Sequence, residues 1–563
     1  MIAFLCRALL LFLALGLAVR AYIASFVDAV PVWVWITGLG NDVLAAALVF
    51  GVFSPVVLVP NRVLRRALIA VAVAITLLVA AAETFYWIEF EARLDRLVFH
   101  YLAYPVEVLV FLDEQFYLTW VGLPFVVLVY GLAIWLDPPV AARPHYVFAA
   151  VLAAVVVGAF ARQGTPGPSR HLNQAASNGY IGVLTAATID VSDAHALFGD
   201  TPAAEPISVA HRSSGLADAH VVLIIEESMA GKNWVDVSSR ERIFPNLLGI
   251  AREGVLFDQA FATGSRTTRG MEAILNGFPP LPGISTTERS RFQELPSLAR
   301  ALSQAGYHTV FAYGGWPDFS NFTNYWQGTG FSETTSRDDF QDASFMTSWG
   351  ASDDDLFRFA LALMDARTAQ HGRVFMSLLT VSHHRPFELP PDSPFAGGRS
   401  AEHALRYADA ALGRFMDAAR SRDWFENTLF VVVADHGPKT RGDRLIPVES
   451  YRVPLVLRHP SLAPAVRSQA VTTMSIPRTL TNLLEVNHSE GFWGADLFAE
   501  TPGPLPVEHD YHMGWIDGQR LLVLTRDGQR FGWNLQGGIG EVVPEVSGMA
   551  GYFRLAHERF YGR

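Results

Sequence analysis

The first 162 residues of the chain contain apolar runs long enough to cross a lipid bilayer. A transmembrane helix needs about 20 predominantly apolar residues, because the hydrocarbon core of a bilayer is about 30 Å thick. Five runs are of suitable length, at residues 2–23, 31–58, 67–90, 116–136 and 146–162. No clear small-x-small cleavage site follows the first run, so we interpret it as a retained anchor and not as a signal peptide. We therefore predict a five-helix transmembrane domain over residues 1–162.

Basic residues between these runs predict the orientation of the chain. Arg62, Arg65 and Arg66 lie between the second and third runs, and Arg143 lies between the fourth and fifth. Short cytoplasmic loops carry an excess of Lys and Arg, so these loops are predicted to face the cytoplasm. Five crossings then place the rest of the chain on the outer face of the membrane. Residues 99–112 are too short to span and are predicted to lie in the outer interface or to pack inside the protein.

Composition excludes several classes of protein. The chain is 50% hydrophobic and 17% charged, which is typical of a membrane part joined to one large folded domain. Its net charge of −11 argues against a nucleic-acid partner. Its only cysteine, Cys6, lies in the first apolar run, so the chain has neither a disulfide framework nor a thiolate metal site. Residues 163–215 are rich in Gly, Pro, Ser and Ala and are predicted to be a linker with short helices.

Residues 216–563 have the sequence pattern of an α/β domain. Short apolar segments alternate there with amphipathic ones, and the apolar segments include HVVLII, VLFDQAFA, YHTVFAYG, RVFMSLLTV and TLFVVVADHG. Strands that alternate with helices predict a mainly parallel sheet with helices on both faces. In such sheets, ligands bind beyond the carboxyl ends of the strands. Near the carboxyl terminus, Asp527-Gly528 predicts a hairpin turn between two further strands.

Polar side chains follow two of the predicted strands. Glu226 and Glu227 come directly after HVVLII, and Asp435 and His436 follow TLFVVV after one alanine. Carboxylate oxygens and imidazole nitrogens suit Mn²⁺, Zn²⁺ or Mg²⁺. Either pair alone is more often a solvated strand end, but two such pairs in one sheet predict a metal site.

The stretch GSRTTRGMEAIL, at residues 264–275, turns from a small-residue loop into a helix start. A helix amino terminus favours phosphate, because its backbone N–H groups are unpaired and its dipole is positive there. A threonine oxygen can attack phosphorus only with a cation or a base beside it. We interpret Thr267 as such a nucleophile. The alternative is that Thr267 or Thr268 caps the helix.

These motifs also carry a resemblance to a known family. VVLIIEES, TGSRTTRGMEA, YGGWPDFSNF, TVSHHRPF and ADHG occur in the order and approximate spacing of membrane-anchored phosphotransferases of the alkaline phosphatase superfamily. The chain resembles the lipoteichoic acid synthase group, and especially the phosphoglycerol transferases that decorate periplasmic glucans. The resemblance covers about residues 218–500 and extends to the five-span anchor. It implies an alkaline phosphatase/sulfatase-like fold and a location in a bacterial inner membrane.

The resemblance assigns roles to individual residues. Glu227, Asp435 and His436 match the metal ligands of the family, and Thr267 matches its metal-bound nucleophile. His384 matches a histidine implicated in substrate binding, whereas its neighbour His383 is better explained as a structural residue.

Other substrate contacts follow less directly. Asn321 matches the asparagine of a Phe-x-Asn element, but Phe322 stands where the synthases have an arginine that holds phosphate. Arg266 or Arg269 would then hold the phosphate, and the glucan-modifying branch is favoured over polymer synthesis. Trp316 could stack on a sugar or glycerol, although an aromatic residue beside a pocket more often simply packs.

Together these residues predict a metal-dependent transfer of phosphoglycerol from phosphatidylglycerol to a periplasmic or cell-surface glycan hydroxyl. The reaction would pass through an ester on Thr267 and release diacylglycerol, with one divalent ion, Mn²⁺ before Zn²⁺ or Mg²⁺, in the site. A phosphoethanolamine transferase and a catalytically inactive membrane sensor are the alternatives. A sulfatase fits less well, because the loop has no Cys/Ser-x-Pro-x-Arg pattern.

Overall fold

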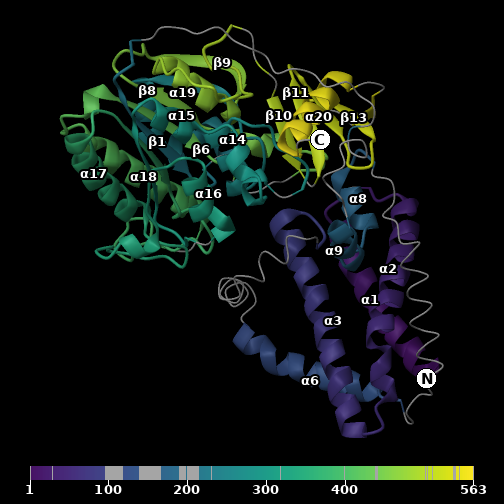
Figure 1. Ribbon diagram of the computed structural model, residues 1–563. Coiled ribbons are helices and arrows are strands. Elements are labelled where there is room, and N and C mark those ends of the chain that lie inside the picture. Colours follow the sequence, from purple (N-terminus) through teal and green to yellow (C-terminus); the bar gives the residue numbers. More distant parts are fainter. Residues whose placement is uncertain are drawn as a thin grey trace. The chain divides into compact units, whose positions relative to one another are not determined.

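The computed structural model describes most of the chain, in two compact units. The described residues are 2–27, 29–94, 118–138, 167–188, 198, 215–229, 231–283, 285–317, 319–397, 400–437, 442–500, 503, 505–509, 511–536, 540–543 and 546–561. The first unit comprises residues 1–190 with 441–444, and the second comprises residues 191–440 with 445–563. Figure 1 shows the helices and strands of both units.

The first unit contains long apolar helices. Their bounds are α1 Ile2–Ala24, α2 Val32–Phe53 with a 3₁₀ extension Ser54–Leu58, α3 Arg62–Phe90 and α6 Leu118–Leu136. Three segments among the described residues are long and apolar enough to cross a membrane: Cys6–Ala24, Val32–Leu58 and Arg62–Ile88. In α6, the apolar helix Pro124–Leu136 falls short of that length. The predicted fifth helix at 146–162 and the interfacial segment at 99–112 lie outside the described residues, so the count of five is not confirmed.

Buried polar contacts hold this unit together. Arg20 of α1 and Asp42 of α2 form an ion pair at 2.8 Å, and each side chain is only 1% exposed. Charges buried this deeply need a partner, because desolvation costs several kcal/mol per ion. Two short helices, α8 (Arg170–Ala176) and α9 (Gly179–Thr188), lie in the predicted linker and belong to this unit. Asn178, between them, donates to the same Asp42 carboxylate at 2.8 Å.

The predicted cytoplasmic arginines converge on one carboxylate in the same unit. Asp137, which follows α6, accepts hydrogen bonds from Arg62, Arg65 and Arg66 at 3.2, 2.8 and 2.7 Å. The side chain of Asn61 caps α3 by accepting from the N–H groups of two residues in its first turn. Residues 61–66 and Asp137 thus tie the start of α3 to the end of α6.

The second unit is built on a nine-stranded sheet. The strands are β1 His220–Glu226, β2 Val255–Phe261, β3 His308–Tyr313, β4 Glu333–Thr334, β5 Val374–Leu379, β6 Thr428–Ala434, β7 Arg452–Val453, β8 Leu455–Arg458 and β9 Ala465–Thr472. Their order is β4-β3-β5-β1-β6-β8-β2-β7, with β9 paired to β2. The strands β4, β3, β5, β1 and β6 run parallel, and each of β1, β5 and β6 is buried along its whole length.

The other side of the sheet adds antiparallel strands to the mainly parallel sheet that was predicted, although β9 pairs parallel with β2 there. The strand β8 pairs antiparallel with both β6 and β2, and β2 also pairs antiparallel with β7, so the sheet is mixed. Parallel neighbours need a crossover of a dozen or more residues, usually a helix. Between β6 and β8, the described residues contain only the short 3₁₀ helix Val448–Tyr451 and the two-residue strand β7, so the chain returns antiparallel.

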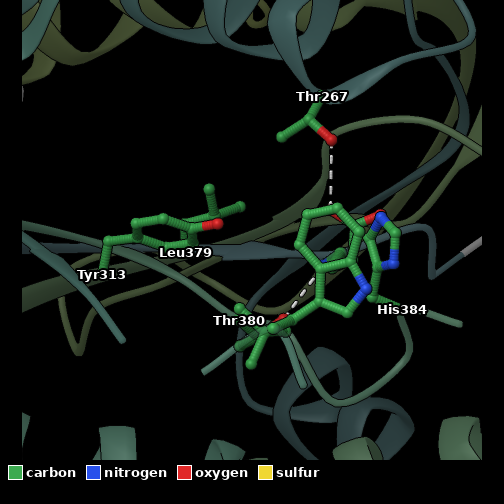
Figure 2. Close-up of a pocket in the computed structure, with 8 residues that line it drawn as sticks. Thr267, Tyr313, Leu379, Thr380 and His384 are labelled. Carbon is green, nitrogen blue, oxygen red and sulfur yellow. Dashed lines mark hydrogen bonds between the residues drawn. The ribbon is translucent and has the colours of Figure 1, made fainter. Parts of the chain in front are cut away.

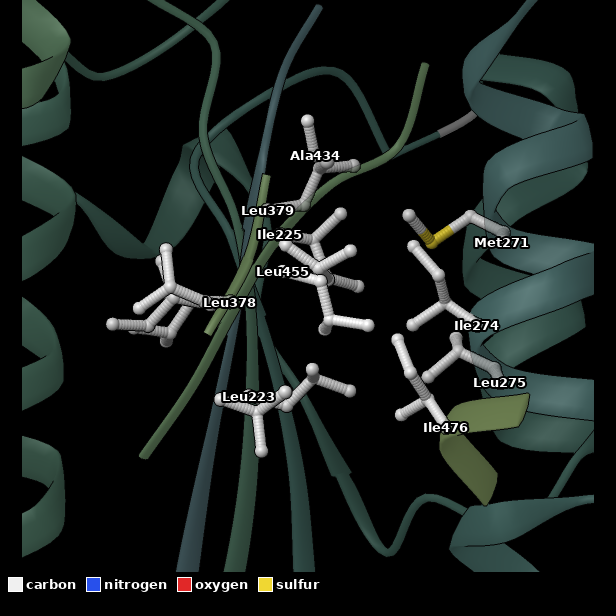
Figure 3. Packing of buried hydrophobic residues seen from close by; sticks show 14 of the residues in the cluster. Leu223, Ile225, Met271, Ile274, Leu275, Leu378, Leu379, Ala434, Leu455 and Ile476 are labelled. Atoms are coloured by element: carbon white, nitrogen blue, oxygen red, sulfur yellow. The ribbon is translucent and has the colours of Figure 1, made fainter. Parts of the chain in front are cut away.

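Helices cover both faces of this sheet, as predicted. Their bounds are α11 Lys232–Val235, α12 Val237–Ile243, α13 Pro245–Arg252, α14 Thr267–Asn276, α15 Leu298–Gln304, α16 Phe322–Gly328, α17 Asp353–Gln370, α18 Ala401–Ala419 and α19 Ile476–Leu483. Figure 3 shows Met271, Ile274 and Leu275 of α14 facing apolar side chains of the sheet that include Ile225 and Leu379. All five are at most 1% exposed, so α14 is anchored firmly against the sheet.

A smaller antiparallel sheet and the helix α20 (Ser547–Tyr561) complete the unit. Its strands are β10 Leu505–His509, β11 His512–Asp517, β12 Arg520–Leu524, β13 Arg530–Asn534 and β14 Glu541–Val542. The predicted hairpin is confirmed, since β12 pairs with β13 across Asp527-Gly528. Gly528 has a φ of +82°, which favours glycine at that position of the turn.

Candidate active site

Three potential metal ligands meet where two parallel strands end. Glu227 follows β1, and Asp435 and His436 follow β6. The register aligns Glu226 with Ala434, so the two strands end side by side. One ligand atom from each of the three residues lies within 4.8 Å of the others. The strand-end argument from the sequence therefore placed these residues together.

The donor set fits a divalent cation. The His436 Nε2 atom lies 3.4 Å from Asp435 Oδ2 and 3.7 Å from Glu227 Oε1. All three residues are buried, and Asp435 Oδ2 accepts no hydrogen bond in the structure. A buried carboxylate oxygen without a donor is costly unless a cation lies next to it. Two carboxylates and one imidazole are ligands that Mn²⁺ and Zn²⁺ accept.

The electrostatics of these residues lead to the same conclusion. Burial raises the pKa of Glu227, and the neighbouring Asp435 carboxylate raises it further. Burial opposes the charge on His436, but Asp435 and Glu227 outweigh it and raise the pKa of that imidazole. Two carboxylates this close do not ionise together easily. A bound cation would relieve that repulsion and keep both carboxylates ionised.

Thr267 is the first residue of α14 and points into the same site. Its hydroxyl donates to Glu227 Oε2 at 3.2 Å, and Figure 2 shows Thr267 with this oxygen on the side of the pocket. The N-cap position of α14 is Arg266, which makes no side-chain cap. Thr267 is therefore not the N-cap residue, and its hydroxyl is directed toward a metal-site carboxylate. Thr268 is more deeply buried, and its backbone carbonyl accepts from Ser285.

Glu227 and Thr267 form one side of a small pocket. It is lined by Glu227, Thr267, Tyr313, Trp349, Leu379, Thr380, Val381 and His384. The pocket contains about 240 Å³ of space, part of it open to solvent. Thr267, Thr380 and His384 give the pocket polar groups, so it suits a small polar ligand such as a phosphate ester.

The position of His384 in this pocket is set by its neighbours. Its Nδ1 atom lies 3.1 Å from the carbonyl oxygen of Arg385, an arrangement in which Nδ1–H donates. The ring of Trp349 lies over the imidazole, with ring centroids 3.5 Å apart, and its Nε1 donates to the same carbonyl at 2.6 Å. Burial lowers the pKa of His384, which favours the neutral ring with Nε2 as an acceptor.

The adjacent histidine has a different environment. His383 is buried, its Nδ1 lies 3.3 Å from the carbonyl oxygen of Glu227, and burial lowers its pKa to about 3. It is absent from the residues that line the pocket. His384 thus lines the pocket and His383 does not, while the role of His384 in substrate binding stays a prediction.

Arg269, in the first turn of α14, makes a set of buried contacts. Its guanidinium donates to Glu272 at 2.8 Å and to the carbonyl oxygens of Leu281 and Gly283 at 2.6 Å each. It also lies 3.4 Å from Glu508 of β10. Phosphate binding by Arg269 stays a prediction, and these contacts favour a structural role instead.

Arg266 remains the better candidate for a phosphate contact. It is exposed at the start of α14, and its charge acts to lower the pKa of His436, which places it near the metal ligands. The other two predicted substrate residues lie outside the pocket lining. Asn321 has a φ of +62° and accepts a hydrogen bond from Asn324, and Trp316 is exposed.

Comparison with known proteins agrees with this geometry. Residues 219–486 match the sulfatase family. Phosphoglycerol transferase I of Xanthomonas campestris pv. campestris is 25% identical over 306 residues, 51% of this chain and 43% of that protein. Phosphoglycerol transferase I of Salmonella arizonae is 24% identical over 241 residues, 38% of this chain and 30% of that protein. The chain thus spans less than half the length of these relatives.

Two solved structures show the same fold as this domain. A protein of the alkaline phosphatase superfamily from Vibrio parahaemolyticus has a TM-score of 0.58 at 24% identity, covering 66% of this chain and 98% of its own. The lipoteichoic acid synthase LtaP of Listeria monocytogenes has a TM-score of 0.52 at 19% identity, covering 62% of this chain and 92% of its own. The second unit therefore has the alkaline phosphatase-like α/β fold that the resemblance in the motifs implied.

The sequence analysis did not predict several residues that line the pocket. Tyr313 ends β3, and Thr380 directly follows β5, which is parallel to β3 and β1. The strand-end rule that located Glu227 applies to these two residues as well. Thr380 accepts from the Glu227 N–H at 2.9 Å and donates to Glu226 at 3.1 Å, so it steadies the metal-site strand. Trp349 lies in an irregular segment, and no local pattern marks it.

Proposed function

We propose that this protein transfers a phosphoglycerol group from phosphatidylglycerol to a glycan hydroxyl, through a covalent ester on Thr267. The observation that carries the proposal is the 3.2 Å contact between the Thr267 hydroxyl and Glu227, inside a pocket that also contains His384. A hydroxyl at a helix start beside a metal-site carboxylate is arranged for attack on phosphorus. The name of the curated relatives supports phosphoglycerol as the transferred group.

The metal site completes this arrangement. Glu227, Asp435 and His436, with the Thr267 oxygen, would hold one divalent ion, and the family resemblance favours Mn²⁺. When bound, such an ion supplies positive charge that stabilises an alkoxide and the oxygens of a phosphoryl group.

In the first half-reaction, Thr267 Oγ forms a bond to the phosphorus of the lipid head group. The bond from phosphorus to the diacylglycerol oxygen breaks, and that oxygen takes up a proton as diacylglycerol leaves. Glu227, which accepts a hydrogen bond from Thr267, takes up the proton of the threonine hydroxyl, and this proton then passes to the leaving diacylglycerol oxygen. The start of α14 adds backbone N–H groups and the positive end of its dipole near the phosphate.

In the second half-reaction, a hydroxyl of the acceptor attacks the same phosphorus and Thr267 leaves. The neutral His384 accepts the acceptor's proton at Nε2, because its Nδ1–H is already directed to the Arg385 carbonyl. His384 gives this proton to the departing Thr267 oxygen, and the phosphoglycerol is then esterified to the acceptor. Arg266, exposed at the helix start, is the candidate contact for the phosphate oxygens.

The membrane part fits a lipid donor. Three candidate membrane helices anchor the chain, and the arginines between them favour an outer position for the catalytic domain. Protease added to spheroplasts is expected to digest the part after residue 190 and to spare residues 60–66. Digestion of the 60–66 loop with protection of the catalytic domain would refute this orientation.

The direct test is mass spectrometry of the full-length protein in detergent, incubated with Mn²⁺ and phosphatidylglycerol but no acceptor. The expected result is a glycerophosphoryl mass on the peptide that contains Thr267, together with release of diacylglycerol. Phosphatidylethanolamine, tested in parallel, should give no such adduct. An adduct from phosphatidylethanolamine alone would identify the other head group as the substrate, and release of diacylglycerol by Thr267→Ala at the wild-type rate would exclude the covalent route.

A further inference from the structure

Five charged residues gather where three helices of the first unit begin or end, and we call them the arginine cluster. They are Arg7 near the start of α1, Arg62, Arg65 and Arg66 at the start of α3, and Asp137 directly after α6. Apolar side chains of the same three helices pack together next to them, and these include Ala8, Ile69 and Leu136. The arginine cluster therefore lies at one end of this bundle of apolar helices.

The aspartate of the arginine cluster is saturated by its hydrogen bonds. Arg65 donates to Oδ1 of Asp137 at 2.8 Å, and the Nε atoms of Arg62 and Arg66 both donate to Oδ2, at 3.2 and 2.7 Å. Arg65 also donates to two backbone carbonyl oxygens, at 2.9 and 3.0 Å, and its side chain is only 3% exposed. Three guanidinium groups thus share a single carboxylate.

The arginine cluster keeps an excess of positive charge. Four arginines against one aspartate leave a net charge of +3, and the stretches 2–10, 54–70 and 130–138 contain no other charged residue. Like charges repel one another strongly next to apolar surroundings, where the dielectric constant is low. Within the described part of the chain, Arg62 and Arg66 donate only through Nε, and their side chains are 62% and 29% exposed. Their terminal N–H groups are therefore available to an anion.

Apolar side chains at the same helix ends remain exposed beside these charges. Arg7 donates to the carbonyl oxygen of Trp135 at 2.6 Å, and its guanidinium lies 5.5 Å from the centroid of the indole ring. Trp135 is 42% exposed, and Val63 and Leu64, between the arginines of α3, are 80% and 52% exposed. Tryptophan at a helix end is typical of the membrane–water interface. This end of the unit thus offers both cationic groups and apolar surface.

We infer that the arginine cluster binds the phosphate group of an anionic phospholipid. A guanidinium presents N–H donors in a planar fork that matches the oxygens of a phosphate. Basic residues at the ends of membrane helices attract anionic lipid head groups. The acyl chains of such a lipid would lie against Val63, Leu64 and Trp135.

This lipid site is separate from the proposed transfer reaction. Under the predicted orientation the arginine cluster faces the cytoplasmic leaflet, whereas the proposed donor reaches the catalytic unit from the outer leaflet. The inference therefore does not depend on the proposed function. It assigns to the first unit a binding role in addition to anchoring.

A role in topology alone is the competing explanation, because basic loops orient membrane proteins without binding a particular lipid. Such a role needs only positive charge ahead of α3. It does not require Arg7 of another helix to join the same group of residues, and it does not require Asp137 to hold three guanidinium groups together. These contacts favour a binding site.

The test is native mass spectrometry of the full-length protein in detergent, titrated with phosphatidic acid or with phosphatidylcholine of the same acyl chains. Phosphatidic acid has an anionic phosphate but no phosphoglycerol group, so it is not the proposed donor. The wild type is expected to bind phosphatidic acid more tightly than phosphatidylcholine. Arg62→Gln should weaken the binding of phosphatidic acid about 5-fold, and the double variant Arg7→Gln with Arg62→Gln roughly 25-fold.

Controls separate charge, fold and lipid chemistry. Arg62→Lys should keep most of the affinity, and Arg62→Gln should have the thermal midpoint of the wild type, because this side chain is 62% exposed. Arg291→Gln, which removes an exposed arginine from the second unit, is the matched control and should bind both lipids as the wild type does. An excess of inorganic phosphate should not displace phosphatidic acid, since the acyl chains also contribute.

Three results would overturn the inference. The first is equal binding of the two lipids by the wild type, and the second is an unchanged preference for phosphatidic acid in the double variant. The third is complete displacement of phosphatidic acid by inorganic phosphate, which would identify an anion site that does not recognise a lipid.

Discussion

Gly270 of α14 lies in direct contact with Asp435, a metal-site residue 165 positions further along the chain. A β-carbon at residue 270 would lie 2.6 Å from Cβ of Asp435 and 2.8 Å from its carbonyl oxygen. No side chain larger than a hydrogen fits there without a shift of backbone. The absence of a side chain thus allows the helix that carries Thr267 to lie directly against the strand end that carries two metal ligands.

We expect Gly270→Ala to separate the nucleophile from the metal site. The added methyl group must push α14 away from Asp435, and a displacement of about 1 Å near reacting groups costs on the order of 100-fold in rate. Diacylglycerol release by the purified protein measures the effect. Gly249→Ala in α13 is the control, because an added β-carbon there meets no atom within 4 Å, and it should retain full activity. Wild-type activity of Gly270→Ala would show that this contact does not position the nucleophile.

Asp435→Ala should remove most of the bound metal and nearly all activity. The change deletes one ligand and leaves Glu227 and His436, too few to hold a divalent ion tightly. Metal content by mass spectrometry and adduct formation on Thr267 are the two measurements. Asp354→Ala is a suitable control, since Asp354 forms a partly exposed ion pair with Arg414 at 2.8 Å and is not one of the metal ligands. Full turnover by Asp435→Ala in a buffer with chelator would contradict the metal site.

The two adjacent threonines are expected to behave differently. Thr267→Ala should abolish adduct formation and turnover, because the attacking oxygen is lost, whereas Thr268→Ala should lose far less activity. Thr267→Ser should retain part of the activity, since the oxygen remains but loses the rotamer restriction that the methyl group imposes. Peptide mass spectrometry of each variant after incubation with phosphatidylglycerol is the measurement. If Thr267→Ala still acquires an adduct and Thr268→Ala is inactive, Thr267 is not the nucleophile.

Arg269 and Arg266 can be distinguished by the kind of damage that their replacement causes. Arg269→Lys should lower the thermal midpoint, because a lysine cannot reproduce the forked contacts with Glu272 and two backbone carbonyls. Arg266→Ala should leave the thermal midpoint unchanged and raise KM for the lipid, since its side chain is exposed. Thermal unfolding and donor kinetics on both variants decide the matter. A raised KM with an unchanged midpoint for Arg269→Lys would restore its predicted role in phosphate binding.

Stability should depend on pH through Asp353, at the start of α17. Its carboxylate accepts from the N–H groups of Val381 and Ser382, which hold the loop that leads to His384. Burial raises the pKa of Asp353 from 3.8 to about 6. Between these values the folded protein binds more protons than the unfolded chain, so stability falls as pH rises and the loss is complete above about pH 6.

Asp353→Asn should therefore reduce the fall in thermal midpoint between about pH 4 and pH 6, measured in chelator. The amide keeps an acceptor for the two N–H groups but cannot ionise, and the shift corresponds to at most about 3 kcal/mol. An identical pH slope in the wild type and in Asp353→Asn would show that this carboxylate does not contribute.

Local patterns in the sequence were sufficient for the elements and for part of the site. Apolar periodicity located the long helices and the buried strands, and Asp527-Gly528 located a hairpin. Because parallel neighbouring strands end at the same edge of a sheet, polar residues at two strand ends could be expected to meet, as Glu227 and Asp435 do. These inferences succeeded because each depends on a few consecutive residues and on one general rule of sheet geometry.

Other features depended on contacts between distant segments. No periodic pattern in the sequence marks these contacts. They are the antiparallel pairing of β8, the burial of Arg269 against Glu508, the packing of Trp349 over His384 and the close approach of Gly270 to Asp435. Each depends on strand register and on the distance between packed backbones. Those quantities are set by the whole core at once, because side chains in a close-packed interior find their neighbours only when every layer is in place.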